Sequence, residues 1–303
     1  MPKHELVRNI ERLKARRGAI ILAHNYQPPE IQDVADRLGD SLDLSRFAAS
    51  VPEKVIIFCG VHFMAETAAI LAPEKTVILP DPSAGCPMAD MLCADDIAAL
   101  KKKHPGAAVI TYVNSTAEVK AQTDVCCTSA NAVHIVQSVP AGTPIIFGPD
   151  RYLGAWVAKQ TGREMILWQG FCPSHQKMYP EQIRELRGKH PDAVVLVHPE
   201  VNPEVAAAAD VVLGTGGMIK YAGSSPAKTF IIGTEVGMIY RLATLYPDKV
   251  FIPVSRHALC PNMKKITLEK IVSSLERLEP VIAVPREIAD RARRAIRIMV
   301  ETA

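Results

Sequence analysis

The sequence predicts an α/β protein made of three similar small domains with parallel sheets, related by pseudo-threefold symmetry around a common centre. Three observations lead to this prediction. Strand-like apolar runs alternate with helical patterns, one block of the sequence recurs three times, and a Cys-Pro pair closes each block. Alternation of this kind is typical of parallel sheets joined by crossover helices, and recurrence at a fixed spacing indicates repeated structural units.

Composition limits the classes of function. The chain has 303 residues, 48% of them hydrophobic, and a formal net charge of +3. This length suits two or three compact domains, and so weak a charge does not favour a nucleic-acid or membrane surface. The longest apolar runs are too short to span a bilayer, and we expect a cytoplasmic protein whose partners are small molecules. In that compartment, seven cysteines indicate free thiols, metal ligands or catalysis rather than disulfides.

Each block opens with a strand-like run that ends on two polar residues. The runs are "AIILAHNYQ" from Ala19, "AAVITYVNS" from Ala107 and "AVVLVHPEV" from Ala193. The polar pairs are His24 and Tyr26, Tyr112 and Asn114, and His198 and Glu200. Side chains two residues apart on a strand point to the same side, and ligands of parallel sheets bind beyond the carboxyl ends of the strands. We therefore expect the three pairs to face one pocket.

A hydroxyl residue follows the first member of each pair at the same distance. Counting 17 residues forward reaches Ser41, Ser129 and Thr215, each before a helical pattern, where an N-cap is expected. Helix N-termini favour anions, so three of them predict a pocket for a small polyanion such as a dicarboxylate or a phosphate ester. Glu200 is the one carboxylate among the strand-end residues and is the expected general base, with Tyr26 and the histidines as proton carriers.

The cysteines that precede proline hold the same place in every block. Cys86, Cys172 and Cys260 are 86 and 88 residues apart, and we expect them to meet as metal ligands. Two kinds of centre stay open from the residues alone: zinc with three ligands and a water, or a [4Fe–4S] cluster with one open iron that acts as a Lewis acid. Cys59, Cys93, Cys126 and Cys127 do not share this pattern, and we interpret them as ordinary residues.

The repeat also predicts the domain boundaries. We expect an N-terminal helix with the first repeat over 1–86, the second repeat over 87–172, the third over 173–262, and helices that pack on the outside over 263–303. Two residues after a glycine of each block stand His62, Asp150 and Glu235, which are further candidates for the pocket. Five more residues lie near the cysteines that precede proline: His175, Arg256, His257, Lys264 and Lys265. The sequence does not decide whether they lie in the pocket or on the surface.

Several motifs together resemble the quinolinate synthase family over essentially the whole chain. They are "AHNYQ" at 23–27, "DSLDLSR" at 40–46, "AGCPMADM" at 84–91, "TYVNSTAEVKAQTDVCCTSANA" at 111–132, "GFCPSH" at 170–175, "HPE" at 198–200, "GTGGMIKY" at 214–221, "GTEVGM" at 233–238 and "LCPNMKKITL" at 259–268.

The resemblance implies a fold, a cofactor and a reaction. It implies three α/β domains around one [4Fe–4S] cluster per chain, held by Cys86, Cys172 and Cys260. The implied reaction condenses iminoaspartate with dihydroxyacetone phosphate to quinolinate, phosphate and two waters, on the route from aspartate to NAD. The implied substrate-binding residues are His24, Ser41, Tyr112, Asn114, Ser129, His198, Glu200 and Thr215. The expected catalytic residues are Tyr26, Tyr112, His198 and Glu200.

Two other functions remain open beside this one. Diphthamide-synthesis enzymes have a similar architecture of three domains and three cysteines on one cluster, but they cleave S-adenosylmethionine and modify a protein. A non-catalytic iron or oxygen sensor would report the state of a cluster to a macromolecular partner, although no basic stripe or DNA-binding motif supports that reading. The sequence also leaves open whether an aspartate oxidase, which would supply the unstable iminoaspartate, docks on the chain.

Overall fold

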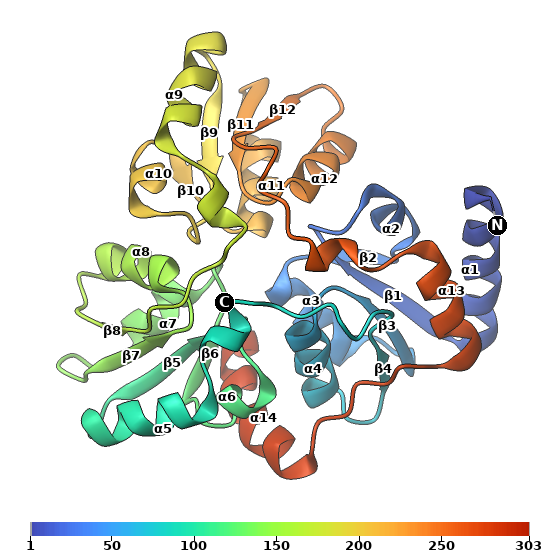
Figure 1. Cartoon of the computed structure of the whole chain (residues 1–303), viewed down its shortest axis with the longest axis horizontal. Coiled ribbons are helices and arrows are strands. Elements are labelled where there is room, and N and C mark those ends of the chain that lie inside the picture. The colour runs from blue at the N-terminus through green and yellow to red at the C-terminus, as the bar shows by residue number, and fades with distance from the viewer. Residues whose placement is uncertain (1, 303) are drawn as a thin grey trace.

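The chain forms three four-stranded parallel sheets that lie around a common centre (Figure 1). The computed structural model describes residues 2–302. The strand orders are β2-β1-β3-β4, β6-β5-β7-β8 and β10-β9-β11-β12, so the same order recurs three times along the chain. The predicted α/β class with three small parallel sheets is thereby confirmed. We call the segments that build these sheets the first, second and third units.

The three units share one succession of elements. The first comprises α1 (Lys3–Arg17), β1 (Ala19–His24), α2 (Pro29–Val34), β2 (Arg37–Gly39), α3 (Ser41–Ser50), β3 (Val55–Cys59), α4 (His62–Leu71) and β4 (Thr76–Ile78). The second comprises α5 (Ala94–Lys103), β5 (Ala108–Tyr112), α6 (Ala117–Lys120), β6 (Val125–Cys127), α7 (Ala132–Ser138), β7 (Ile145–Gly148), α8 (Arg151–Thr161) and β8 (Ile166–Leu167). The third comprises α9 (Pro180–Lys189), β9 (Val194–Val197), α10 (Pro203–Ala207), β10 (Val211–Val212), α11 (Thr215–Ser224), β11 (Thr229–Gly233), α12 (Gly237–Leu245) and β12 (Val250–Pro253).

The central strands are continuous apolar runs because helices cover both faces of each sheet. Every residue of β1 is buried, and so is every residue of β3. The same local contact supports the first strand of all three units. The carboxylates of Asp36, Asp124 and Asp210 accept the backbone N–H groups of Ile21, Val109 and Val195, each 15 residues earlier, at 2.7–2.8 Å. The units therefore resemble one another in detail as well as in strand order.

A buried lysine joins the first two units beside the centre. The Lys120 ammonium, at the end of α6, donates to the Thr67 hydroxyl of α4 at 3.0 Å and to the Ser115 carbonyl at 2.7 Å. The Ser115 hydroxyl in turn donates to the Tyr112 carbonyl at 2.8 Å. Because a buried ammonium is costly unless all its donors are bonded, this contact fixes the loop after β5 against the first unit.

Two C-terminal helices complete the fold. Helix α13 (Leu268–Arg277) packs against α1, and α14 (Arg286–Glu301) packs against α4, α6 and β6, between the first and second units. The buried face of α14 consists of Ala289, Ala292, Ala295, Ile296 and Met299, and its small side chains allow a close approach. Within residues 2–302, no helix has both the length and the apolar character that crossing a bilayer requires.

Candidate active site

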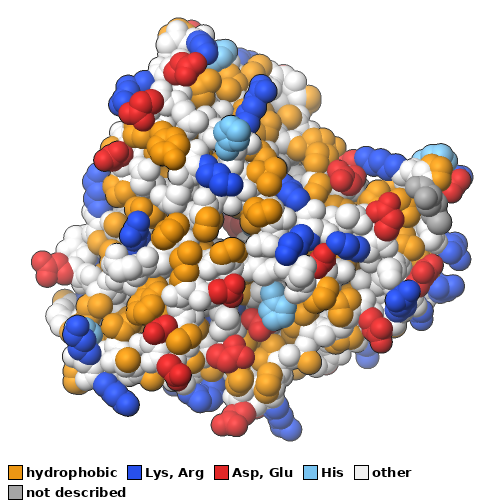
Figure 2. All heavy atoms as spheres, in the orientation of Figure 1, with side chains coloured by type: hydrophobic (Ala, Val, Ile, Leu, Met, Phe, Trp, Pro, Cys, Tyr) orange, Lys and Arg blue, Asp and Glu red, His pale blue; other side chains and the backbone are white. Residues whose placement is uncertain are grey.

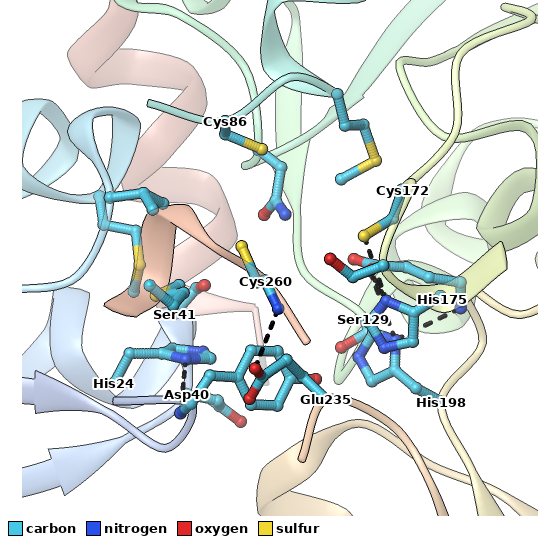
Figure 3. A pocket seen from close by; sticks show the side chains of 18 of the residues that line it. His24, Asp40, Ser41, Cys86, Ser129, Cys172, His175, His198, Glu235 and Cys260 are labelled. Carbon is cyan, nitrogen blue, oxygen red and sulfur yellow. Dashed lines mark hydrogen bonds and ion pairs between the residues drawn. The ribbon is translucent and has the colours of Figure 1, made fainter. Parts of the chain in front are cut away.

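The carboxyl ends of the central strands open onto one cavity at the centre of the molecule. Figure 2 shows the face of the molecule that is hollowed there, and Figure 3 shows side chains from all three units around the cavity. The cavity and its opening enclose about 720 Å³ outside the protein atoms. The twelve residues expected as catalytic, substrate-binding or metal-binding all line it: His24, Tyr26, Ser41, Cys86, Tyr112, Asn114, Ser129, Cys172, His198, Glu200, Thr215 and Cys260.

Two histidines at strand ends are held as neutral hydrogen-bond donors. Removal from water is the main reason that the pKa of His24 falls to about 3, and the neighbouring His198 contributes to the same shift. Burial likewise lowers the pKa of His198, to about 4. In each ring Nδ1 accepts the backbone N–H two residues later, from Tyr26 at 3.1 Å and from Glu200 at 3.3 Å. A neutral imidazole with Nδ1 as acceptor carries its proton on Nε2, so both rings offer an Nε2–H donor.

The hydroxyl residues line the cavity, but the prediction that they are N-caps is wrong. Ser41 is the first residue of α3, and the cap is Asp40, whose Oδ1 accepts the N–H groups of Leu42 and Asp43 at 2.9 Å. Thr215 begins α11 after Gly214, and Ser129 lies two residues before Asn131, the residue that precedes α7.

A carboxylate accepts two helix N–H groups better than a hydroxyl does, so Asp40 caps α3 and Ser41 can face the cavity. This arrangement also weakens the expectation of three helix N-termini open to an anion, because α3 is already capped by an acid. The hydroxyl and imidazole side chains are the more direct donors toward an anionic ligand.

A short turn follows each Cys-Pro pair and directs backbone N–H groups at the sulfur. The turns are η1 (Ala89–Met91), η2 (His175–Lys177) and η3 (Asn262–Lys264). Burial raises the pKa of Cys86 to about 12, while the N–H groups of Ala89 and Met88 act in the opposite direction. Proline after the cysteine fixes φ and carries no N–H, which favours a turn whose later N–H groups point back. The recurring Cys-Pro pair thus has a local structural reason.

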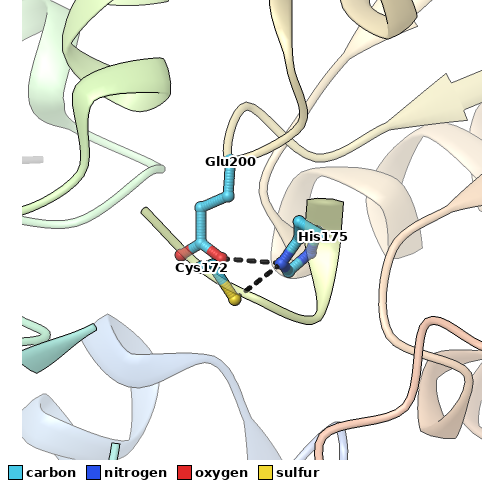
Figure 4. Close-up of side chains that lie close together, drawn as sticks. All are labelled: Cys172, His175 and Glu200. Carbon is cyan, nitrogen blue, oxygen red and sulfur yellow. Dashed lines mark hydrogen bonds and ion pairs between the residues drawn. The ribbon is translucent and has the colours of Figure 1, made fainter. Parts of the chain in front are cut away.

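Glu200 lies at the centre of a buried hydrogen-bonded network. The Tyr112 hydroxyl donates to Oε1 at 2.6 Å. Nδ1 of His175 lies 2.8 Å from Oε2 and 3.2 Å from the Cys172 sulfur (Figure 4). Burial alone raises the pKa of Glu200, but His175, His198 and the hydrogen bonds outweigh it and hold the pKa below its usual range. Glu200 is therefore held as a carboxylate.

The network continues from Glu200 to the second tyrosine of the cavity. His175 Nε2 lies 2.9 Å from the Thr234 hydroxyl, which lies 2.5 Å from the Tyr26 hydroxyl. Burial raises the pKa of Tyr26, and the charge of Glu200 raises it further, so Tyr26 is a neutral phenol. An unbroken series of hydrogen bonds therefore joins Tyr26 to Tyr112 through Thr234, His175 and Glu200.

Several residues of this site were missed or left open at the level of sequence. His175 is buried, although its place was open, and the spacing of three residues after Cys172 is the signal that would have located it. Thr234 and Asp40 carried no distinguishing signal. Of the three equivalent candidates, Glu235 lines the cavity, and Asp150 is buried but is not among the lining residues. His62 lines a neighbouring pocket that shares Phe63, Gly85 and Cys86 with the cavity.

Comparison with known proteins identifies the relationship. The family model described as "Quinolinate synthetase A protein" matches residues 8–301. The chain belongs to the quinolinate synthase family. It is 56% identical over 290 residues to the quinolinate synthase of Dehalococcoides mccartyi strain CBDB1, covering 96% of both chains. It is 52% identical over 295 residues to that of Desulforudis audaxviator, with 97% of both chains covered. It is 51% identical over 291 residues to that of Methanoregula boonei, with 96% of both chains covered.

Membership of the quinolinate synthase family confirms the resemblance drawn from the motifs. The match extends over nearly the whole chain, so it includes all three units and the loops that carry the cavity residues. The individual roles of those residues in binding and catalysis stay predictions.

Proposed function

We propose that this chain is a quinolinate synthase that condenses iminoaspartate with dihydroxyacetone phosphate to quinolinate, phosphate and two waters. One observation carries the proposal: in a chain of this family, the three strand-end pairs, the three hydroxyl residues and the three cysteines all line one buried cavity. Such a set of acid, base and anion-binding groups around three thiols suits proton transfer on small anionic substrates.

Three features support an iron–sulfur cluster at Cys86, Cys172 and Cys260. All three cysteines line the cavity, and backbone N–H groups approach each sulfur. Burial raises the pKa of Cys86 and of Cys172, and the neighbouring cysteine adds to the shift, Cys260 for Cys86 and Cys86 for Cys172. Two thiolates on one zinc lie about 3.8 Å apart because each Zn–S bond is about 2.3 Å. Among the described residues, the one group of ligand atoms within 4.8 Å of one another is Cys172, His175 and Glu200.

The three cysteines do not form such a group, so their spacing suits the wider thiolates of a cluster better than a single ion. We therefore propose a [4Fe–4S] cluster on these three residues. When bound with one iron free of protein ligands, it would supply a Lewis acid for loss of a hydroxyl.

The substrate anions would be bound mainly by neutral donors. His24 and His198 offer Nε2–H groups, and the hydroxyls of Ser41 and Ser129 face the same space. Asn114 also lines the cavity, and its amide oxygen is buried without a hydrogen-bond partner, so it would accept an O–H or N–H of the substrate rather than bind a carboxylate. Because the cavity is largely closed to water, these hydrogen bonds are stronger than they would be in solvent.

Proton transfer would be carried out by Glu200 and the two tyrosines. The Glu200 carboxylate is ionised and can take a proton from the triose, while the Tyr112 hydroxyl that donates to it keeps it oriented. The neutral Tyr26 hydroxyl, which also lines the cavity, can donate a proton. Because the Thr234 and His175 contacts join these groups, a proton taken at Glu200 can be returned at Tyr26.

The test is an anaerobic assay for quinolinate on protein with quantified iron, sulfide and zinc. Dihydroxyacetone phosphate is supplied together with iminoaspartate generated in place by an aspartate oxidase, and the same assay is repeated after exposure to air. We expect quinolinate that depends on both substrates and is lost in air. An intact cluster without quinolinate would contradict the reaction, and zinc without sulfide would instead favour an ion at Cys172, His175 and Glu200.

A further inference from the structure

We propose that Glu235 is a positioning residue that couples the loop of Cys260 to the loop of Tyr26 through one buried carboxylate. The inference rests on the proposed function, because it concerns a cysteine assigned to the cluster and a tyrosine assigned to proton transfer. Glu235 follows β11 in the third unit, whereas Tyr26 follows β1 in the first. The coupling therefore joins two units at the centre of the molecule.

One oxygen of the carboxylate holds the cysteine loop. Glu235 is 1% exposed, and its Oε1 accepts the backbone N–H of Cys260 at 3.0 Å, as Figure 3 shows. The same oxygen lies 2.9 Å from the ammonium of Lys264, which belongs to η3. Both ends of the turn that carries the sulfur of Cys260 are thus attached to Glu235.

The lysine holds the tyrosine loop, and the other oxygen fixes the segment that packs against it. Oε2 of Glu235 accepts the N–H of Gly237 at 2.7 Å, and Lys264 donates to the carbonyl of Tyr26. Gly237 packs directly on that carbonyl, because a Cβ at Gly237 would lie 2.6 Å from the Tyr26 oxygen. Gln32 adds a further connection by donating to the carbonyls of Gly237 and Gln27 at 3.1 and 2.9 Å.

The charges make Glu235 and Lys264 depend on each other. A buried carboxylate is strongly unfavourable without a positive partner, and removing one member of a buried ion pair leaves the other uncompensated. The Lys264 side chain is 21% exposed, and it binds both the carboxylate and the Tyr26 carbonyl. Loss of either charge is therefore expected to release both loops together.

The equivalent residues of the other units do not make this connection. Oδ1 of Asp150 caps its own helix, α8, by accepting the N–H groups of Tyr152 and Leu153 at 2.8 Å. The backbone N–H of Cys172 also approaches Asp150, so Asp150 shares the contact with a cysteine turn but not the link to a strand-end loop of another unit. The side chain of His62 is 45% exposed and lies beside Glu66 of its own helix. Among these three equivalent positions, it is Glu235 that bridges a cysteine turn and the catalytic loop of a different unit.

The test compares Glu235→Gln and Lys264→Met with the wild-type holoenzyme. Glutamine keeps the size of the side chain but loses the charge, and its NH₂ group must face one of the two amides. We expect iron release to a chelator to be about 10-fold faster and kcat about 10-fold lower, with KM within about 2-fold of wild type, because outer partners of metal ligands typically have effects of this size. Lys264→Arg, which keeps a charged donor, is expected to lie closer to wild type than Lys264→Met.

Matched controls come from an exposed ion pair of the same unit. Lys228 and Asp248 lie 2.7 Å apart, with both side chains more than half exposed. Lys228→Met and Asp248→Asn remove the same charges, and we expect both to leave iron release and kcat unchanged. Thermal unfolding of every variant shows whether an effect is merely a loss of stability.

A second measurement separates the coupling from the proposed reaction. In metal-free protein, the alkylation rate of each cysteine is followed by mass spectrometry of its peptides. Glu235→Gln should speed alkylation of Cys260 relative to Cys86, whose turn does not contact Glu235. This ratio tests the coupling without any assay of the reaction. If the wild-type chain makes no quinolinate, that result contradicts the proposed function but not the coupling. Unchanged alkylation, iron release and kcat in both Glu235→Gln and Lys264→Met would overturn the inference, as would a lower melting temperature alone. Lys264→Met decides the question if Glu235→Gln does not fold.

Discussion

His24 and His198 enter the site as hydrogen-bond donors rather than cations, because burial lowers the pKa of both rings far below neutral. The backbone completes this arrangement, since the N–H two residues later is bound to Nδ1 in both rings. A polar residue at the end of a strand and the N–H of the residue two positions on thus define one tautomer. In the pairs at 24 and 26 and at 198 and 200, both side chains face the cavity, and the backbone of the second residue also fixes the tautomer of the first.

Glu200→Gln should abolish most of the activity and leave the metal content unchanged. Loss of a positioned general base typically costs about 10²- to 10⁴-fold in rate, and Glu200 is not one of the three cysteines assigned to the cluster. Anaerobic kcat and iron analysis test this, with Glu204→Gln on the exposed side of α10 as the matched control. Near-normal turnover in Glu200→Gln would remove this residue from the mechanism.

Cys86→Ala should lose cluster and activity together, whereas Cys126→Ala should keep both. The two substitutions remove the same thiol group. Cys86 faces the cavity, whereas Cys126 is buried in β6, where burial raises its pKa to about 11. Iron and sulfide content and the visible absorption of the cluster measure the difference. A full complement of iron in Cys86→Ala would refute the ligand assignment.

At the level of elements, the turn that ends each unit and the aspartate that supports its first strand occur three times. The repeat was readable from the sequence because each copy keeps the same residue types at the same spacing, as at Ser41, Ser129 and Thr215. The helix caps could not be predicted from the sequence, because "GDS" at 39–41 contains two neighbouring residues, Asp40 and Ser41, that both cap helices well. The fold decides which of the two is the cap. His175 reaches Glu200 from the turn η2, and its spacing of three residues after Cys172 is the one sequence signal for that position.

Asp210→Asn should flatten the acid dependence of stability. Burial raises the pKa of Asp210, but hydrogen bonds from Arg187 and from the Val195 N–H lower it overall. A carboxyl whose folded pKa is depressed stabilises the protein above its unfolded pKa of about 3.9, and this stabilisation is lost as the pH falls through the folded pKa.

Thermal unfolding between neutral pH and about pH 3, where these carboxyls titrate, measures the effect in wild type and variant. We expect the variant to be less stable at neutral pH and to lose less stability on acidification. Asp192→Asn, the same change of charge at an exposed residue of the third unit, corrects for net charge. A variant curve that runs parallel to the wild-type curve at all pH values would contradict the prediction.

At the scale of the whole molecule, the cavity belongs to no single unit. His24, Tyr112 and His198 come from three different sheets, and α14, Lys120 and Glu235 hold the units against one another. The sequence predicts the convergence of these residues through the rule for parallel strands. It does not predict the contacts between units, because Lys120 and Glu235 reach residues more than 20 positions away and no local pattern records such pairs.

A dicarboxylate that fits this cavity should stabilise the whole chain. Because it would contact more than one unit, binding to the folded state opposes unfolding of all of them, by about 2.7 kcal/mol at a concentration of 100 Kd. We expect pyridine-2,3-dicarboxylate to raise the melting temperature of the anaerobic protein more than nicotinate, which lacks one carboxylate. Equal shifts with the two compounds would show that the second carboxylate is not recognised.

The positions of the three cysteines have a further consequence for the chain as a polymer. Each lies after the last strand of its unit, so each marks the point where the chain leaves one sheet. A group bound to all three sulfurs would close two covalent rings that enclose 86 and 88 residues of backbone. Rings of this length remove much of the conformational freedom of an unfolded chain. The centre that would perform the chemistry would thus also act as a cross-link, and its loss would cost the fold a constraint along with the reaction.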